Sequence, residues 1–303
     1  MAQPLSTAAD ITQQDAVRQL CEQLEFFQQH PPLEIRPLAA GQSNLNYYLR
    51  TARGEYVLRR YARQLGICRQ QEFRCQQAAA AKQIAATPLL LHNHQQLLIS
   101  EFLPGGEPLQ LTDSRLSLLA DTLAILHNLR VQTPLLQPAS YLRQLLAQGQ
   151  QSTLQPAADL FAALQRCAEQ LAGMATDLVL CHLDLHADNL LWNGNKIWLL
   201  DFEYSQLCDN SFDLAAIMLH FELTTTQQQR LLHQYSAQRR YPDRHTAERL
   251  AATLPQRLQL AKCLYSGFCW LWYQATPALH HRANSWQQRL QQLLQSETTE
   301  PFR

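Results

Sequence analysis

The chain lacks an excess of charge of either sign and a long hydrophobic run. Its 25 basic and 25 acidic residues cancel and are spread along 303 residues, so the electrostatic pattern typical of nucleic-acid or membrane-surface binding is missing. No apolar run approaches the roughly 20 residues that cross a bilayer, and the chain start shows neither a basic segment nor an apolar signal core. We therefore expect a cytoplasmic protein with no nucleic-acid and no membrane partner.

Paired cysteines are missing as well. The eight cysteines form no Cys-x-x-Cys pair and no clustered Cys/His spacing. This pattern argues against a zinc site or a disulfide framework, and it predicts reduced thiols that serve as small apolar groups.

The first third of the sequence predicts helices and a small antiparallel sheet. Helical periodicity covers about 10–29 and 67–86. Two strand-like runs at 45–51 and 55–60 are separated by Ala52-Arg53-Gly54, which is a short hairpin signal. A further strand at 97–103 stops at Pro104-Gly105-Gly106. We place the boundary there and predict two lobes, 1–103 and 104–303.

The second lobe is predicted to be mainly helical, with three short apolar runs as exceptions. These runs are 178–181, 190–192 and 196–200, and Asn193-Gly194-Asn195 joins the last two as a strong hairpin signal. Late in the chain, Pro255 can start a helix that Pro277 ends.

Polar residues gather around that hairpin. The turn brings Asn189 and Asp201 to the same end of the hairpin, where an amide oxygen and a carboxylate suit Mg²⁺, a hard cation with oxygen ligands. Asp184 precedes Asn189 by five positions and can serve as a general base toward a substrate hydroxyl. Each residue alone is also compatible with a turn or cap, so the spacing of all three supports the chemical interpretation.

The order His182-x-Asp184-x-x-x-x-Asn189, followed by an apolar strand and Asp201-Phe202-Glu203-Tyr204, resembles the aminoglycoside phosphotransferase and choline kinase superfamily. The Asp-Phe-Glu-Tyr segment is typical of choline, ethanolamine and thiamine kinases. The resemblance implies a protein-kinase-like two-lobed α+β fold, with a small antiparallel-sheet N-terminal lobe that binds nucleotide and a larger mainly helical C-terminal lobe. It also implies ATP and Mg²⁺ as cofactors, with Asp184 as catalytic residue and Asn189 and Asp201 as metal ligands.

The resemblance extends in order along nearly the whole chain. Residues 41–61 resemble the phosphate-covering hairpin and third strand of that family, where Gly41, Ser43 and Asn44 would meet phosphate oxygens. Arg59 stands where protein kinases have the phosphate-binding lysine, although strand alternation leaves Arg60 as the alternative.

Three further residues of the first lobe complete the expected nucleotide site. Glu72 is the expected ion-pair partner of Arg59, with an exposed helix position as its alternative. Glu101 and Leu103 lie in the segment that resembles the interlobe hinge, whose backbone would meet an adenine edge.

Substrate identity must come from residues outside the metal site. By resemblance to the cation-binding choline kinases, Tyr204, Trp270 and Tyr273 are candidates for an aromatic cage around a cation. Core packing is the alternative for Trp270 and Tyr273, because their helix is apolar nearly all round. Glu203 is assigned to the substrate or, equally, to a structural role.

Several residues depart from the family pattern or support the loop. Leu183 stands where a small residue or Asn is usual, and Ala187-Asp188 replace a common Pro-Gly, which puts the loop geometry in doubt. Asp213 matches an aspartate of the superfamily and is expected to anchor the structure beneath the site.

The resulting hypothesis is an ATP-dependent phosphotransferase acting on a hydroxyl of a small cationic metabolite of the choline, ethanolamine or thiamine type. An aminoglycoside, sugar or amino-alcohol phosphotransferase is the alternative within the same class. A nucleotide-binding pseudokinase that acts as an interaction module, and a metal-dependent hydrolase, are alternatives of other classes.

Overall fold

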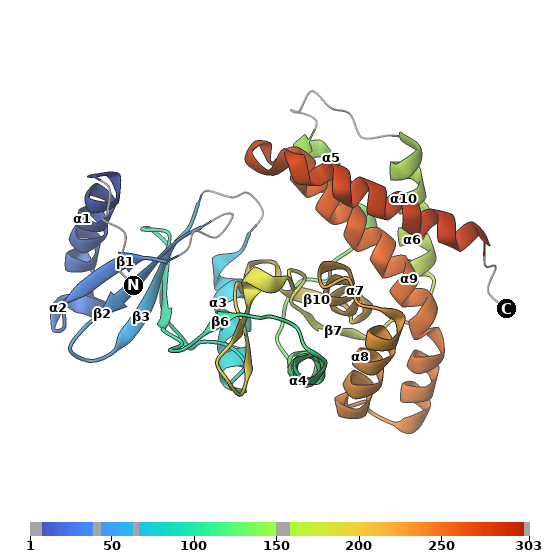
Figure 1. Ribbon diagram of the computed structural model, residues 1–303, viewed down its shortest axis with the longest axis horizontal. Helices are drawn as coiled ribbons and strands as arrows, with labels where there is room; N and C mark the ends of the chain where they lie inside the picture. The colour runs from blue at the N-terminus through green and yellow to red at the C-terminus, as the bar shows by residue number, and fades with distance from the viewer. Residues whose placement is uncertain (1–7, 39–43, 63–66, 150–157, 300–303) are drawn as a thin grey trace. The chain divides into compact units, whose positions relative to one another are not determined.

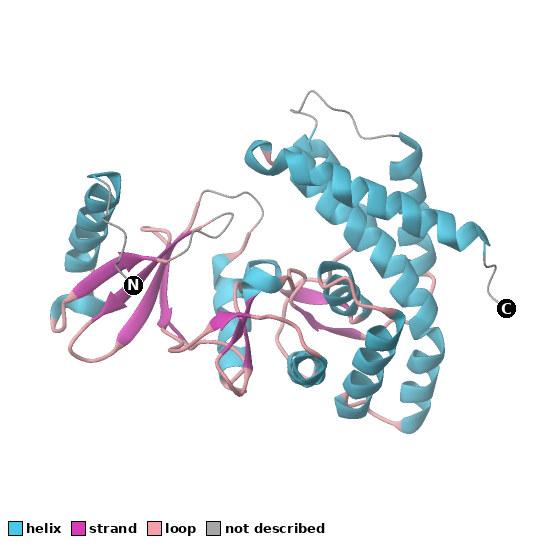
Figure 2. Cartoon of the chain, in the orientation of Figure 1, coloured by secondary structure: helices cyan, strands magenta, loops and turns pink. Residues whose placement is uncertain are grey.

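A computed structural model describes residues 8–38, 44–62, 67–149 and 158–299 (Figure 1). Helices and strands occur together, as expected for an α+β fold (Figure 2). The chain divides into two compact units: unit 1 comprises Met1–Gln110 and Asp188–Tyr204, and unit 2 comprises Leu111–Ala187 and Ser205–Arg303. Within the described ranges, no helix combines the length and the apolar character that a membrane span requires.

Unit 1 is built around a five-stranded antiparallel sheet. Its strands are β1 (Glu34–Pro37), β2 (Leu45–Arg50), β3 (Glu55–Arg60), β4 (Pro88–His92) and β5 (Leu97–Glu101), in the order β1-β2-β3-β5-β4. The predicted hairpin is confirmed, because Leu45 pairs with Arg60 and Arg50 with Glu55. Its turn closes through the Thr51 amide, which donates to the Gly54 carbonyl.

Helices flank this sheet. The segment expected to be one helix at 10–29 is two helices, α1 (Ala8–Gln23) and α2 (Glu25–Gln28), because Leu24 adopts an extended conformation between them. Val17 and Phe27 from these helices pack with Leu49 and Leu58 of the sheet, and this apolar contact forms the core of unit 1. The helix expected at 67–86 is α3 (Arg69–Ala80).

The hairpin between Asn189 and Asp201 belongs to unit 1. It consists of β8 (Leu190–Trp192) and β9 (Ile197–Leu199), and β6 (Glu107–Pro108) pairs with β8. A backbone hydrogen bond from Leu199 to the Ile84 carbonyl ties β9 to the segment after α3. Because of these pairings, the division falls after Gln110 rather than at the expected boundary after Leu103, and the hairpin is separated from the helical unit.

Unit 2 is mainly helical, as predicted. Its helices are α4 (Asp113–His127), α5 (Pro138–Gly149), α6 (Ala158–Ala172), α7 (Ser211–His220), α8 (Thr225–Gln238), α9 (Arg244–Ala275) and α10 (Ala283–Thr299). Strands β7 (Leu178–Cys181) and β10 (Gln206–Asp209) pair antiparallel. Three short 3-10 helices cover Ala187–Asn189, Phe202–Tyr204 and Pro277–Arg282, of which the second lies in unit 1 and the first spans the boundary of the units.

Pro255 does not start α9, contrary to the sequence expectation. The helix begins at Arg244, where the side chain of Asp243 accepts a hydrogen bond from the Thr246 amide at 2.7 Å. A proline within a helix weakens the hydrogen bonding of the preceding turn. Arg257 donates to the Leu250 carbonyl at 2.9 Å, and α9 continues through Pro255 to Ala275.

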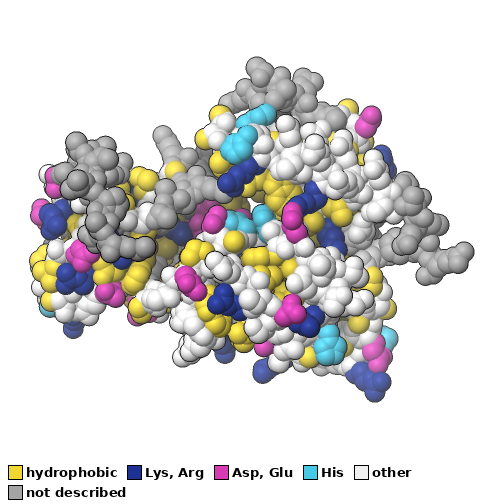
Figure 3. Space-filling view, in the orientation of Figure 1, with side chains coloured by type: hydrophobic (Ala, Val, Ile, Leu, Met, Phe, Trp, Pro, Cys, Tyr) yellow, Lys and Arg dark blue, Asp and Glu magenta, His cyan; other side chains and the backbone are white. Residues whose placement is uncertain are grey.

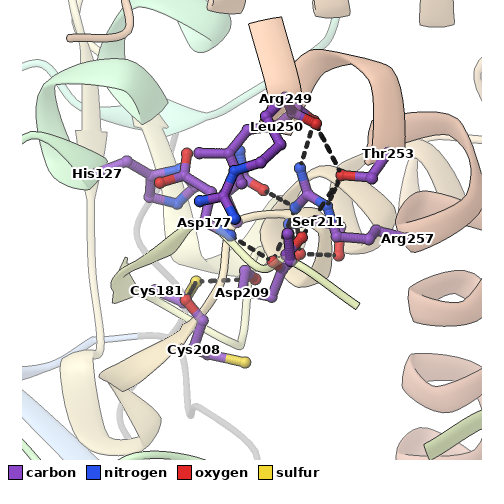
Figure 4. A network of polar contacts seen from close by, with 12 residues as sticks. His127, Asp177, Cys181, Cys208, Asp209, Ser211, Arg249, Leu250, Thr253 and Arg257 are labelled. Atoms are coloured by element: carbon purple, nitrogen blue, oxygen red, sulfur yellow. Dashed lines mark hydrogen bonds and ion pairs between the residues drawn. The ribbon is translucent and has the colours of Figure 1, made fainter. Parts of the chain in front are cut away.

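Arg257 also organises a buried polar network in unit 2 (Figure 4). Its guanidinium is 1% exposed and donates to both carboxylate oxygens of Asp209, at 2.8 and 2.7 Å. Asp209 in turn accepts hydrogen bonds from the backbone amides of Asp177 and Ser211. A buried charge requires a partner of opposite charge. The pairing of Arg257 on α9 with Asp209 at the end of β10 therefore joins these two elements.

Candidate functional site

The β8–β9 hairpin places Asn189 and Asp201 at one end, as the sequence predicted. Leu190 pairs with Leu199, and the Leu200 amide donates to the Asn189 carbonyl at 2.9 Å. At the other end, Gly194 has a φ of +96° in the predicted turn. Residues before the first strand and after the second strand of a hairpin therefore share one end of it.

Arg59 and Asp201 form an ion pair in unit 1. Arg59 Nη1 lies 2.6 Å from Asp201 Oδ1 and 3.2 Å from Glu72 Oε1. The expected pairing of Arg59 with Glu72 is thus present, while Arg60 is exposed. Burial alone lowers the pKa of Arg59, but the carboxylates of Asp201 and Glu72 outweigh it and raise the pKa above its usual value.

A second arginine, Arg69, was not identified from the sequence. Its Nη1 lies 3.1 Å from Glu72 Oε2 and 3.0 Å from Glu203 Oε2, and its guanidinium stacks 3.7 Å from the Tyr61 ring centroid. The spacing of Arg69 and Glu72 by three positions at a helix start was the available signal. Arg69 and Glu203 are 134 residues apart, so no local sequence pattern could show that they pair.

Glu203 is held from two sides. Besides Arg69, the Asn44 amide donates to Glu203 Oε2 at 3.3 Å. Burial and repulsion from Asp201 raise the pKa of Glu203 to about 7, although Arg69 acts in the opposite direction. Its contacts therefore favour a structural role in this unit. Gly41 and Ser43, which were expected to meet phosphate beside Asn44, lie outside the described residues.

The donor set at this end of the hairpin fits a hard cation. Asn189 offers an amide oxygen and Asp201 a carboxylate, the ligand types that Mg²⁺ prefers. The Arg59 guanidinium is the positively charged partner of the Asp201 carboxylate. Two arginines, Arg59 and Arg69, face the carboxyl groups of Glu72, Asp201 and Glu203 in this cluster.

The hinge-like segment is positioned by the sheet of unit 1. Glu101 is the last residue of β5, and its amide donates to the Thr87 carbonyl at 2.9 Å. A contact of Glu101 with an adenine edge stays a prediction. Leu103 follows in the loop and is half-buried.

In unit 2, Asp213 anchors the loop that carries Asp184. Its carboxylate is fully buried and accepts hydrogen bonds from the backbone amides of His182, at 2.7 Å, and Leu183, at 2.8 Å. His127 Nε2 donates to the same carboxylate at 3.0 Å, and Tyr235 contacts the other ring nitrogen of His127 at 2.8 Å. This agrees with the expected anchoring role.

His127, Cys181 and Asp213 bring three potential metal-ligating atoms within 4.8 Å of one another. However, both oxygens of Asp213 already accept backbone hydrogen bonds, and Cys181 Sγ contacts backbone carbonyls of the neighbouring strand. A buried carboxylate with this many donors is satisfied as it stands. The group therefore serves as a hydrogen-bonded support of the loop.

Asp184 itself is partly accessible, with 29% of its side chain exposed. His186 Nε2 lies 3.6 Å from Asp184 Oδ1, which is an ion-pair distance and longer than a good hydrogen bond. Burial raises the pKa of Asp184, but the neighbouring imidazoles, above all His186, outweigh it and lower the pKa below its usual value. The carboxylate is thus kept ionised.

The departure at Leu183 has a visible backbone consequence. Its φ is +67°, in the left-handed region that costs an ordinary residue about 1 kcal/mol or more. We expect Leu183→Asn to be more stable than Leu183→Val, because Asn tolerates this conformation and a β-branched residue does not. Urea unfolding of the two variants measures the difference. If Val is the more stable, the apolar contacts of this half-buried side chain outweigh backbone strain.

The aromatic candidates for a cation cage are divided between the units. Tyr204, in unit 1, is half-buried. In unit 2, Trp270 on α9 is 0% exposed and packs in the core, whereas Tyr273 is 9% exposed with the Arg282 guanidinium 5.9 Å from its ring centroid. The structure therefore favours the packing alternative for Trp270. A role of Tyr204 and Tyr273 toward a substrate stays a prediction.

The charged surface matches the balanced composition. On the face shown in Figure 3, acidic and basic side chains are interspersed among the described residues, without a broad patch of one sign.

Comparison with known proteins identifies the family. A model described as the phosphotransferase enzyme family matches residues 34–264. No curated protein sequence matches significantly.

Several solved structures are similar. A choline/ethanolamine kinase family protein from Mesorhizobium loti is 18% identical, with a TM-score of 0.73 over 92% of this chain and 94% of that one. The choline kinase LicA from Streptococcus pneumoniae is 19% identical, with a TM-score of 0.74 over 93% and 99%. A spectinomycin phosphotransferase, in complex with ADP and spectinomycin, is 14% identical, with a TM-score of 0.59 over 96% and 95%.

Proposed function

Because this chain belongs to the phosphotransferase enzyme family, we propose that it transfers the terminal phosphoryl group of ATP to a hydroxyl of a small cationic metabolite. The observation that carries the proposal is the hairpin register, which sets Asn189 and Asp201 at one end beside the Arg59–Glu72 ion pair. Phosphoryl transfer depends mainly on positioning and charge neutralisation, and these residues supply both.

Asn189 and Asp201 are proposed to hold Mg²⁺, and Arg59 to bind phosphate oxygens. Mg²⁺, when bound, neutralises the charge that develops on the phosphoryl group. Arg59 pairs with Asp201 in this structure, so binding phosphate requires Arg59 to leave the Asp201 carboxylate. The ion pair with Glu72 would keep the Arg59 guanidinium in place. Asp184 is proposed to orient or deprotonate the acceptor hydroxyl.

A cationic acceptor is supported by the similarity to choline kinases and by the half-buried Tyr204, three residues after the proposed metal ligand Asp201. Aromatic faces attract quaternary ammonium groups without hydrogen bonds. The similarity to a spectinomycin phosphotransferase supports an antibiotic acceptor as the second candidate.

ADP release over a panel of acceptors tests this function. The panel contains choline, ethanolamine, thiamine, an aminoglycoside and neutral sugars, with Asp184→Asn as the inactive control. We expect Mg²⁺-dependent turnover on one of the small cations. Turnover on a neutral sugar alone would contradict the cationic acceptor but not phosphoryl transfer. Release of phosphate without any acceptor would indicate a hydrolase, and nucleotide binding without turnover would indicate a pseudokinase.

A further inference from the structure

A group of imidazole and aromatic rings surrounds one side of Asp184 in unit 2. His186, from the loop, lies 3.6 Å from the Asp184 carboxylate, and the ring centroids of His186 and His220 are 5.6 Å apart. His220 ends α7, and its Nε2 lies 3.0 Å from the Tyr265 hydroxyl of α9. Trp286 of α10 completes the group, with its ring centroid 5.1 Å from that of His220.

The inner members of this group are firmly held. Tyr265 and Trp286 are 4% and 7% exposed, and they meet the His220 ring at angles of 80° and 66°. Burial and the neighbouring His186 lower the pKa of His220 to about 4, although Asp184 acts in the opposite direction. His220 is therefore neutral near pH 7 and can share one hydrogen with Tyr265.

We propose that His186 is a positioning residue for Asp184, and that His220, fixed by Tyr265 and Trp286, holds the His186 ring against that carboxylate. The proposal rests on the proposed function in one respect, since it takes Asp184 as the base of the reaction. The loop contacts the carboxylate through His186, and α7, α9 and α10 supply the rings behind it.

The consequence of this arrangement is electrostatic as well as steric. His182 and His186 of the same loop and His220 of α7 influence the pKa of Asp184. The charge of Asp184 in turn raises the pKa values of Tyr265, Cys269 and Tyr273 on α9. Among the histidines, His186 makes the close contact. It favours the ionised form of Asp184, so its removal raises the pKa of Asp184 and moves the acid limb of kcat/KM to higher pH.

Titration of the Asp184 carboxyl tests the contact without requiring activity. The ¹³C signals of carboxyl-labelled aspartate are followed with pH by NMR, and Asp184→Asn identifies the signal of interest. In His186→Ala, we expect the Asp184 midpoint to rise by about half a pH unit or more. His186→Gln keeps a donor near Nε2 without charge and should give a smaller rise. His233→Gln, at an exposed position of α8, should give none.

The role of His220 is tested by His220→Phe, which keeps a ring but removes the bond to Tyr265. It should raise the Asp184 midpoint by less than His186→Ala, and the double variant should equal His186→Ala, because His220 acts through His186. An additive double variant would contradict that order of action.

Kinetics complete the test. The pH profile of kcat/KM should shift in the same direction as the carboxyl titration, a response that a purely structural role would not produce. An unmoved Asp184 midpoint in both His186 variants would overturn the proposal. A protein that phosphorylates no acceptor, but whose Asp184 midpoint does rise, would contradict the proposed function and leave the contact intact.

Discussion

Replacing Asp201 with asparagine is expected to reduce turnover by about a thousandfold or more. The substitution keeps the size of the side chain and removes the charge that is proposed to hold Mg²⁺. It also turns the ion pair with Arg59, whose Nη1 lies 2.6 Å from Asp201 Oδ1, into a neutral contact. Because phosphoryl transfer relies on charge neutralisation, the loss should be at least as large as that in Asp184→Asn.

Steady-state kinetics with varied Mg²⁺ concentration measure this effect. Thermal unfolding with ATP, with and without Mg²⁺, adds a readout that is independent of turnover: Mg²⁺ should no longer increase the stabilisation by nucleotide in Asp201→Asn. Asp159→Asn, at an exposed position of α6, is the matched control. Near-normal turnover of Asp201→Asn would show that the metal assignment is wrong.

Replacing Asp213 with alanine is expected to lower the free energy of unfolding by about 3 kcal/mol or more. The change leaves the backbone amides of His182 and Leu183 and the ring nitrogen of His127 without their common acceptor. The His182 amide and the His127 ring are buried and the Leu183 amide is partly buried, and a buried donor left unpaired costs about 1–3 kcal/mol. The loop that carries Asp184 also loses its support, so turnover should fall with stability.

Urea unfolding compares Asp213→Ala with Asp213→Asn and with the exposed control Asp159→Ala. Asparagine keeps one acceptor oxygen, so the free energy of unfolding of Asp213→Asn should lie between those of the wild type and Asp213→Ala. A loss below about 1 kcal/mol for Asp213→Ala would mean that water or another group satisfies these donors, and the anchoring role would be refuted.

The same carboxylate illustrates what sequence patterns could and could not predict. A superfamily match placed Asp213 beneath the site, but its two backbone donors and His127 became visible only in the fold. The Arg59–Glu72 pair was predicted, whereas the hold of Arg59 on Asp201, 142 residues away, was not. Arg69 was missed altogether, since both its role and its partner Glu203 depend on the packing of α3.

Local patterns determined the parts of this protein that depend on neighbouring residues. The Asn193-Gly194-Asn195 turn and the two short strands were sufficient to align Asn189 with Asp201, because hairpin register follows from turn type and strand length. Asp184 lies five positions before Asn189, so this spacing was also readable from the sequence. Periodicity also predicted a small sheet followed by a mainly helical part, and the family resemblance implied the two-lobed α+β fold.

Tertiary structure decided which side chains are buried and which charges meet. Trp270 and Tyr273 share one helix, and packing in unit 2 buries both, which leaves 0% of Trp270 and 9% of Tyr273 exposed. Pro255 reads as a helix start in sequence, but α9 begins at Arg244, where Asp243 caps it, and continues through the proline. The physical reason is common to these cases: burial and ion pairing depend on contacts between segments far apart in the chain, which no local pattern encodes.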